Sequence, residues 1–183
     1  MVPELPAVVT EPLDHTHSWL RLADLAWTDP LDPTFAPVVG GRWTPVGGPP
    51  TLYFNADVAT ARANVRRLCA GYSLVPEDLD DDNGYVLVAA RLPAGQRVAD
   101  AHTSAGLAAL GLPSTYPVDG RGGEVGHAAC QRIGQAIFDD GLDGVHCRSA
   151  ATHDGSGREL GWFPGAGSRA RRRTIRRFGD WYY

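Results

Sequence analysis

The residue types best suited to binding a phosphorylated ligand lie in the glycine-rich segment 40–53. It begins with the sequence GGRW, in which Gly41 precedes Arg42, and after a second glycine pair it runs into a strand-like stretch that contains Tyr53. Paired glycines allow a ligand to approach the backbone closely. An arginine offers a planar fork of donors that suits phosphate oxygens. The segment is therefore either a phosphate-facing turn or, as is common for such sequences, a turn without a ligand.

Two further segments accompany this turn. A helix is predicted over 57–71, with Asp57 as its N-cap. The segment 141–150 reads as a helix stop followed by a strand that ends at Ser149. A hydroxyl at that place could hold a polar group of a ligand, but serine at a strand end is also typical of a turn or cap. Tyr53 is likewise either a platform for a ligand or part of the core.

The elements that must position these residues indicate an α+β domain. Alternating and continuous apolar runs predict short strands, and apolar residues at helical spacing predict helices. A proline- and glycine-rich loop spans 29–50, and loops of that length inside compact domains are usually functional or disordered. The predicted strands are 18–22, 51–54, 85–92, 144–149 and 158–163, and the predicted helices are 57–71, 103–110 and 124–140.

The chain is expected to divide into a mobile lead-in over 1–17, one domain over 18–165 and an arginine-rich C-terminal tail over 166–183. The segment 168–177 concentrates arginines, which predicts a solvated tail or a dock for an acidic partner or nucleic acid. The apolar ending 181–183 suggests packing on the domain or on a partner, which includes self-association.

Composition limits the remaining possibilities. The 183 residues carry a formal net charge of −4, so direct nucleic-acid binding and attraction to anionic membranes are not expected. The chain has no apolar run of about 18 residues and no signal-peptide pattern at its start, which favours a cytoplasmic protein. The six histidines fall on separate predicted elements without the spacing of a zinc site, so no metal is expected.

The order and spacing of these segments resemble the RES domain family. The run GGRWTPVGGPPTLYFNADVATARANV is similar to the family's signature, in which a Gly-Arg-Trp turn and a tyrosine-bearing strand lead into an alanine-rich helix. The stretches 141–150 and 158–164 resemble its closing strands, and the strand with Arg21 matches its opening segment. The resemblance covers roughly residues 18–165.

The resemblance implies an ADP-ribosyltransferase-like α+β fold, with short strands in a split sheet and flanking helices. It implies a toxin of a bacterial toxin–antitoxin system that degrades NAD by hydrolysis or phosphorolysis, or that transfers ADP-ribose to a protein. NAD would be the substrate, no metal would be required, and an Xre-type DNA-binding antitoxin would be the partner.

The resemblance also implies roles for individual residues. Arg21 and Arg42 would hold the diphosphate of NAD, Tyr53 would stack near the nicotinamide, and Ser149 would position the ribose or the nicotinamide amide. Residues in contact with NAD would be Gly41, Arg42, Trp43, Tyr53 and Ser149.

The resemblance places Asn64 where the family has a catalytic glutamate. A carboxylate at ~5 Å from the developing positive charge on ribose is worth roughly 3 kcal/mol at an effective dielectric near 20, and its loss would slow cleavage on the order of 10²-fold. Asn64 projects from the edge of the apolar stripe of its helix, a position that suits either a cleft or the surface. Another acid, Glu124, Asp57 or Glu159, could take the role. Otherwise the chain is a weakened enzyme or a binding module without catalysis.

Overall fold

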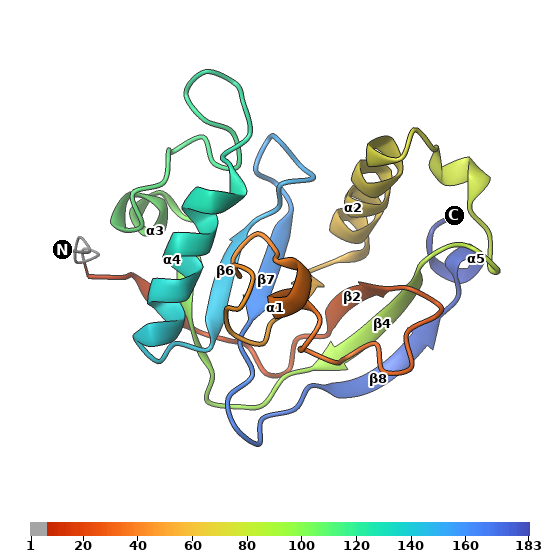
Figure 1. Ribbon diagram of the computed structural model, residues 1–183, viewed down its shortest axis with the longest axis horizontal. Coiled ribbons are helices and arrows are strands. Elements are labelled where there is room, and N and C mark those ends of the chain that lie inside the picture. Colours follow the sequence, from red (N-terminus) through yellow and green to blue (C-terminus); the bar gives the residue numbers. More distant parts are fainter. Residues whose placement is uncertain (1–6) are drawn as a thin grey trace.

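The computed structural model describes residues 7–183, which build one eight-stranded sheet with helices against it (Figure 1). The strand order is β1-β5-β6-β7-β3-β2-β4-β8, and all neighbouring pairs are antiparallel except β5 and β6, which are parallel. The strands are β1 (Thr10–Pro12), β2 (Trp19–Ala23), β3 (Leu52–Asn55), β4 (Val86–Arg91), β5 (Arg97–Ala101), β6 (Gly144–Arg148), β7 (Arg158–Trp162) and β8 (Arg171–Arg176).

The sheet is split near its middle. The pair β2 and β3 shares a single register position, Leu20 opposite Asn55. The pairs on either side, β3 with β7 and β2 with β4, run in register over their whole lengths. The two halves of the sheet therefore diverge from this one contact, as expected for a split sheet.

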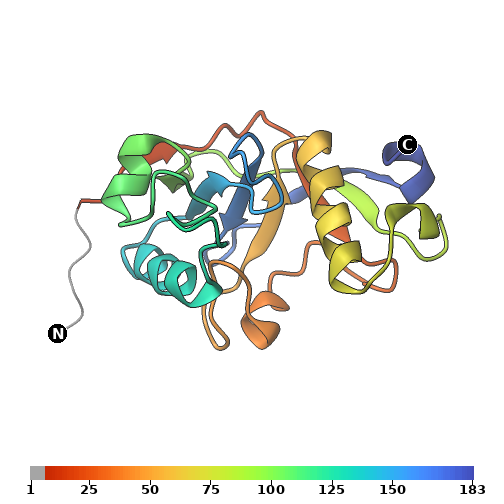
Figure 2. The same ribbon diagram turned by 90° about the horizontal axis from the view of Figure 1, so that it is seen from above.

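Helices cover the two halves separately. In Figures 1 and 2, α3 and α4 lie beside one half of the sheet and α2 lies beside the other. Contacts link α3 to β5, α4 to β6, and α2 to β2 and β3. The helices are α1 (Ala36–Val39), α2 (Val58–Gly71), the 3-10 turn η1 (Pro76–Asp78), α3 (Ser104–Ala109), α4 (His127–Asp139) and α5 (Phe178–Trp181).

Local sequence explains where α2 and α4 begin. Asp57 caps α2, and its carboxylate accepts a hydrogen bond from the backbone N of Thr60 at 2.7 Å. Helix α4 begins at His127, later than the predicted residue 124, because Gly126 takes the N-cap position. Gly134 lets α4 pack against the glycine-rich turn, since a Cβ there would lie 1.9 Å from the carbonyl oxygen of Trp43.

The arginine-rich segment forms an edge strand of the sheet and not a tail, although its side chains are mostly exposed, as a solvated segment requires. Residues 171–176 form β8, which pairs antiparallel with β4. Beyond it, Phe178 and Trp181 are buried in the cluster that includes Ala61 and Val65 of α2. The apolar ending thus packs on its own domain. Backbone pairing and aromatic burial hold this segment in place.

The prediction of a mobile lead-in is wrong for residues 10–12, which form β1 at the opposite edge of the sheet. Residues 1–6 of that lead-in lie outside the described residues. Sequence patterns also missed β5, because its short sequence RVADA interrupts the apolar run with an aspartate. Within residues 7–183, no helix has both the length and the apolar character needed to cross a membrane.

Candidate active site

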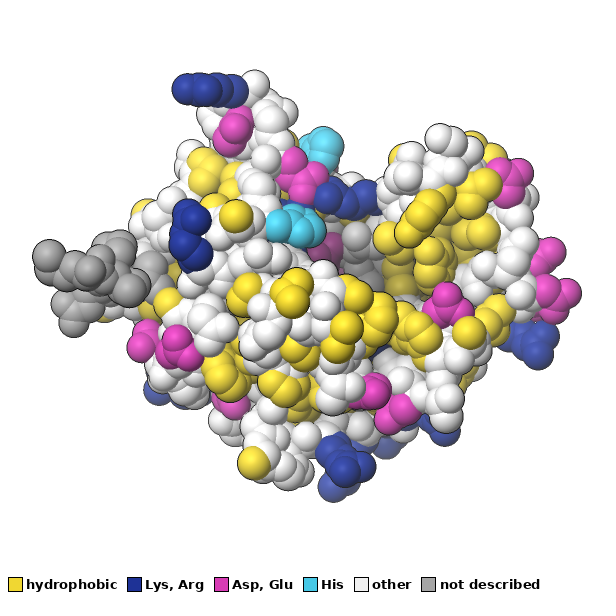
Figure 3. Space-filling view, viewed as in Figure 1, with side chains coloured by type: hydrophobic (Ala, Val, Ile, Leu, Met, Phe, Trp, Pro, Cys, Tyr) yellow, Lys and Arg dark blue, Asp and Glu magenta, His cyan; other side chains and the backbone are white. Residues whose placement is uncertain are grey.

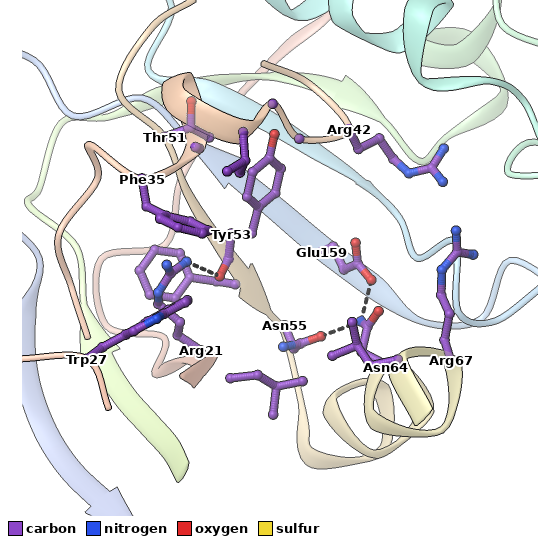
Figure 4. A pocket seen from close by; sticks show the side chains of 17 residues that line it. Arg21, Trp27, Phe35, Arg42, Thr51, Tyr53, Asn55, Asn64, Arg67 and Glu159 are labelled. Carbon is purple, nitrogen blue, oxygen red and sulfur yellow. Dashed lines mark hydrogen bonds between the residues drawn. The ribbon is translucent and has the colours of Figure 1, made fainter. Parts of the chain in front are cut away.

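A cavity of about 320 Å³ lies where the sheet splits, a volume at the lower end for ligand sites. Figure 3 shows the hollow between the two lobes, with arginine, acidic and histidine side chains around its rim. Its walls come from β2, the segment 24–51 that follows it, β3, α2 and β7. The polar and aromatic side chains that line it are Arg21, Trp27, Phe35, Arg42, Thr51, Tyr53, Asn55, Asn64, Arg67 and Glu159 (Figure 4).

The cavity contains a carboxylate, that of Glu159 on β7. Its Oε1 accepts hydrogen bonds from Nδ2 of Asn64 at 2.6 Å and from Oγ of Ser149 at 2.5 Å. Glu159 lies opposite Asn55 in the pairing of β3 with β7. Of the three acids considered from sequence, Glu159 is the one that meets Asn64.

Asn64 faces this cavity and is not on the free surface. Its Nδ2 also donates to Oδ1 of Asn55 at 2.8 Å, so both neighbours are acceptors (Figure 4). Because the amide nitrogen is engaged by Asn55 and Glu159, the carbonyl oxygen of Asn64 is left to accept a hydrogen bond from a ligand hydroxyl.

The other two candidate acids have different roles. Asp57 caps α2. Glu124 pairs with the guanidinium of Arg42, and Arg67 holds both of its oxygens at 2.7 Å. Hydrogen bonds from Arg67, together with the charge of Arg42, lower the pKa of Glu124 to about 2. Glu124 is thus a fully ionised carboxylate bound between two arginines.

Arg42 and Arg67 converge on the rim of the cavity from opposite sides. Nη1 of Arg42 donates to the carbonyl of Val125 at 3.1 Å, and Nη1 of Arg67 donates to that of Ala150 at 2.8 Å. Each guanidinium is therefore oriented by backbone as well as by Glu124. Sequence reasoning missed Arg67, although it follows Asn64 by three residues and must share its helix face.

Arg21 lines the cavity but is largely engaged by the protein itself. Its Nε donates to the carbonyl of Pro30 at 2.7 Å and its Nη1 to that of Tyr53 at 3.2 Å, and its guanidinium lies 5.3 Å from the ring centre of Trp27. Burial lowers the pKa of Arg21 to about 10, so it remains protonated at neutral pH. Arg21 fastens the 29–50 loop to β3 and adds a positive charge beside the cavity.

Three aromatic rings form one wall of the cavity. Trp27 and Phe35 lie 5.4 Å apart at 46°, and Tyr53 stands nearby on β3 (Figure 4). Phe35 is 49% exposed, so a ligand in the cavity could cover its ring. Neither Trp27 nor Phe35 was predicted, because the segment that carries them, between β2 and α1, has no periodic pattern.

Gly41 supports Tyr53 in this wall. A Cβ at Gly41 would lie 2.4 Å from the hydroxyl oxygen of Tyr53, so only glycine lets the ring pack beneath the turn. The hydroxyl accepts a hydrogen bond from the backbone N of Trp43 at 3.0 Å. The glycine-rich turn and Tyr53 are thus held together by close packing and by this hydrogen bond.

Two residues expected to touch a ligand do not line the cavity. Trp43 is 1% exposed and its indole donates to Sγ of Cys147 at 3.3 Å, so it is a core residue. Ser149 is fully buried, where it donates to Glu159 and accepts from the backbone N of Ala151 at 3.0 Å. Both residues lie behind side chains that line the cavity. The backbone N of Trp43 donates to Tyr53, and the hydroxyl of Ser149 donates to Glu159.

Comparison with known proteins agrees with this architecture. The RES domain family model matches residues 13–180. Among solved structures, the chain resembles a chain in the crystal structure of the M. tuberculosis MbcT–MbcA toxin–antitoxin complex. The TM-score is 0.75 and the identity 20%, over 94% of this chain and 91% of that chain. No curated protein is similar enough in sequence to count as a match. The ADP-ribosyltransferase-like α+β fold is confirmed, and the chain belongs to the RES domain family.

Proposed function

We propose that this protein is an NAD-cleaving toxin that breaks the nicotinamide–ribose bond. The observation that carries the proposal is the carboxylate of Glu159 inside the cavity, bound to Asn64 where the family has its glutamate. Position 64 of α2 carries no charge in this chain. The carboxylate of Glu159 on β7 would supply that charge, since it lies 2.6 Å from the amide nitrogen of Asn64.

The chemistry needs a negative charge beside the ribose. As the bond to nicotinamide breaks, the bonding electrons leave with nicotinamide and positive charge builds on the ribose ring, as in glycoside hydrolysis. The Glu159 carboxylate would stabilise that charge, and the Asn64 carbonyl would accept a hydrogen bond from a ribose hydroxyl. Ser149 would hold Glu159 in place, since it donates to the same oxygen.

The remaining lining residues suit the other parts of NAD. Arg42 and Arg67 present guanidinium groups that already hold a carboxylate, and a diphosphate offers the same kind of acceptor oxygens. Arg21 would add charge at the inner end of the cavity. The wall of Trp27, Phe35 and Tyr53 would stack against the nicotinamide.

A partner protein is part of the proposal. The solved structure that this chain resembles is a toxin–antitoxin complex, and the family resemblance implies an antitoxin of the Xre type. NAD cleavage would then be harmful to the cell, in the cytoplasm, until the antitoxin binds.

The test is nicotinamide release from NAD by the purified protein, with and without inorganic phosphate. We expect release, and we expect Glu159→Gln to slow it by at least ~10²-fold, as for other losses of transition-state charge stabilisation. Glu77→Gln, an exposed acid on η1, is the matched control and should leave the rate unchanged. Faster release in phosphate would identify a phosphorylase, and equal release a hydrolase.

Two outcomes would contradict the proposal. Wild-type rates in Glu159→Gln would show that Glu159 does not supply the charge. No release by the wild type in either buffer, and none after Asn64→Glu, would leave a binding module that keeps the fold. ADP-ribose found on cellular proteins by mass spectrometry would instead identify a protein ADP-ribosyltransferase.

A further inference from the structure

Three metal-ligating side chains meet away from the cavity, at the edge of the sheet where β1, β5 and β6 adjoin. They are Glu11, His102 and His146, and one ligand atom from each lies within 4.8 Å of the others. Oε1 of Glu11 is 2.5 Å from Nδ1 of His146 and 3.1 Å from Nε2 of His102. The two imidazole ring centres are 4.4 Å apart.

Strand pairing brings these residues to one face of the sheet. Glu11 lies opposite Val98 on β5, and Asp100, two residues further on that strand, lies beside His146 on β6. His102 follows directly after the end of β5, and its Nε2 lies 3.1 Å from Oε1 of Glu11. The meeting of the three side chains is thus a consequence of register.

This face is the one opposite the cavity. In the pairing of β6 with β7, His146 lies opposite Leu160, whereas Cys147 lies opposite Glu159. Adjacent strand residues point to opposite faces, so the cluster of Glu11, His102 and His146 and the carboxylate of Glu159 lie on different sides of the sheet. The cluster plays no direct part in the proposed NAD chemistry.

We propose that Glu11, His102 and His146 bind a zinc ion. Two imidazole nitrogens and one carboxylate oxygen are ligands that zinc favours, with bonds of about 2.0–2.2 Å. Tetrahedral bonds of that length place ligand atoms roughly 3.3 Å apart. Oε1 of Glu11 lies 3.1 Å from Nε2 of His102, close to that value, and 2.5 Å from Nδ1 of His146, so a small side-chain rotation that widens the second gap would open room for the ion.

The ring of His146 is held in a partly buried place, with only 19% of its side chain exposed. Trp19 packs edge-on against the His146 ring at 5.5 Å. Nε2 of His146 is buried and has no hydrogen-bond partner among residues 7–183, so the ring meets the cluster through Nδ1, which lies 2.5 Å from Oε1 of Glu11.

The second histidine is oriented by neighbours of its own. Oδ1 of Asp100 accepts a hydrogen bond from the backbone N of His102 at 2.8 Å, and it lies 3.6 Å from Nε2 of that ring. Arg148 donates to the carbonyl of His102 at 2.9 Å. Zinc bound here would tie the three-residue strand β1 to β5 and β6.

The experiment is zinc binding by the untagged full-length protein after chelator treatment and dialysis, measured by competition with a chromophoric chelator. We expect one zinc ion per chain. His102→Ala and His146→Ala should each weaken binding by at least about 100-fold, because each removes a direct ligand. His15→Ala is the matched control, since it removes an exposed histidine from the same N-terminal region.

Thermal unfolding gives a second measurement that does not depend on NAD cleavage. Zinc should raise the unfolding midpoint of the wild type by at least about 2 °C and should not shift that of the conservative variant Glu11→Gln. If an alanine variant fails to fold by circular dichroism, Glu11→Gln carries the test. No binding of added zinc by the wild type, or equal affinity in the wild type and the ligand variants, would overturn the proposal.

Discussion

At the scale of single residues, the cavity brings together an amide of α2 and a carboxylate of β7. Asn64 on α2 and Glu159 on β7 are 95 residues apart in sequence, yet Nδ2 of one lies 2.6 Å from Oε1 of the other. The field of a carboxylate depends on its distance from the reacting atoms and not on the element that carries it. We therefore propose that Glu159 supplies the charge that the family resemblance places at position 64.

Gly41 allows a prediction at this scale. Gly41→Ala should displace the ring of Tyr53, because the new Cβ would lie 2.4 Å from its hydroxyl oxygen. We expect a destabilisation of about 1–3 kcal/mol, typical of overpacking, and slower nicotinamide release. Chemical denaturation and the NAD assay measure the two effects. Gly120→Ala is the control, since a Cβ there would meet open space, and equal behaviour of the two variants would contradict the role of Gly41.

At the scale of elements, the C-terminal segment shows how a charged sequence can still be structural. The side chains of β8 are mostly exposed, yet its backbone pairs with β4 along the strand. Arginines on an edge strand protect its free side from pairing with other chains. Helix α5 then closes the cluster beneath α2 with Phe178 and Trp181.

Trp181→Ala tests whether this segment is required for the domain. Trp181 is 2% exposed and its indole donates to the carbonyl of Tyr85 at 3.0 Å. We expect a loss of about 3–5 kcal/mol in the free energy of unfolding, as for other buried tryptophans. The matched control Tyr72→Ala, at a ring that is 75% exposed, should change stability by about 0.5 kcal/mol or less. Equal stability of the two variants would show that the segment is a dispensable tail.

At the scale of the whole molecule, the cavity exists because the sheet divides. Its lining comes from both halves, with Arg21 on β2 and Tyr53 on β3. Between these strands the only shared register position is Leu20 opposite Asn55. We call this contact between β2 and β3 the seam of the sheet. The amide of Asn55 bridges the seam, since its Nδ2 donates to the carbonyl of Leu20 at 3.1 Å and its Oδ1 accepts from Asn64.

Asn55→Ala should therefore weaken the contact between β2 and β3 that joins the two halves of the sheet. The variant leaves buried polar groups without partners, which costs about 1–3 kcal/mol, and it frees Asn64 to move away from Glu159. We expect a lower unfolding midpoint together with slower nicotinamide release. Asn83→Ala, in an exposed turn, removes the same side chain far from the seam and should cost less. A stable Asn55→Ala variant with the wild-type rate would show that the seam does not depend on this amide.

The sequence by itself determined the features that depend on neighbouring residues. Apolar periodicity and the Asp57 cap predicted α2 and most strands, which the structure confirms within a few residues. The glycine-rich turn with Arg42, the strand with Tyr53 and the helix with Asn64 follow one another directly in the chain. Their order carried the resemblance to the RES family, which the family model confirms.

Only the tertiary structure decided which distant residues meet. Glu159 reaches Asn64 through the pairing of β3 with β7, and Glu11 reaches His146 through the order β1-β5-β6. Strand partners and register are fixed by packing across the whole sheet, and a shift of one residue would turn each side chain to the other face. No local sequence pattern specifies which strands pair or in which register. The acid of the candidate active site and the candidate zinc ligands therefore became visible only in the folded molecule.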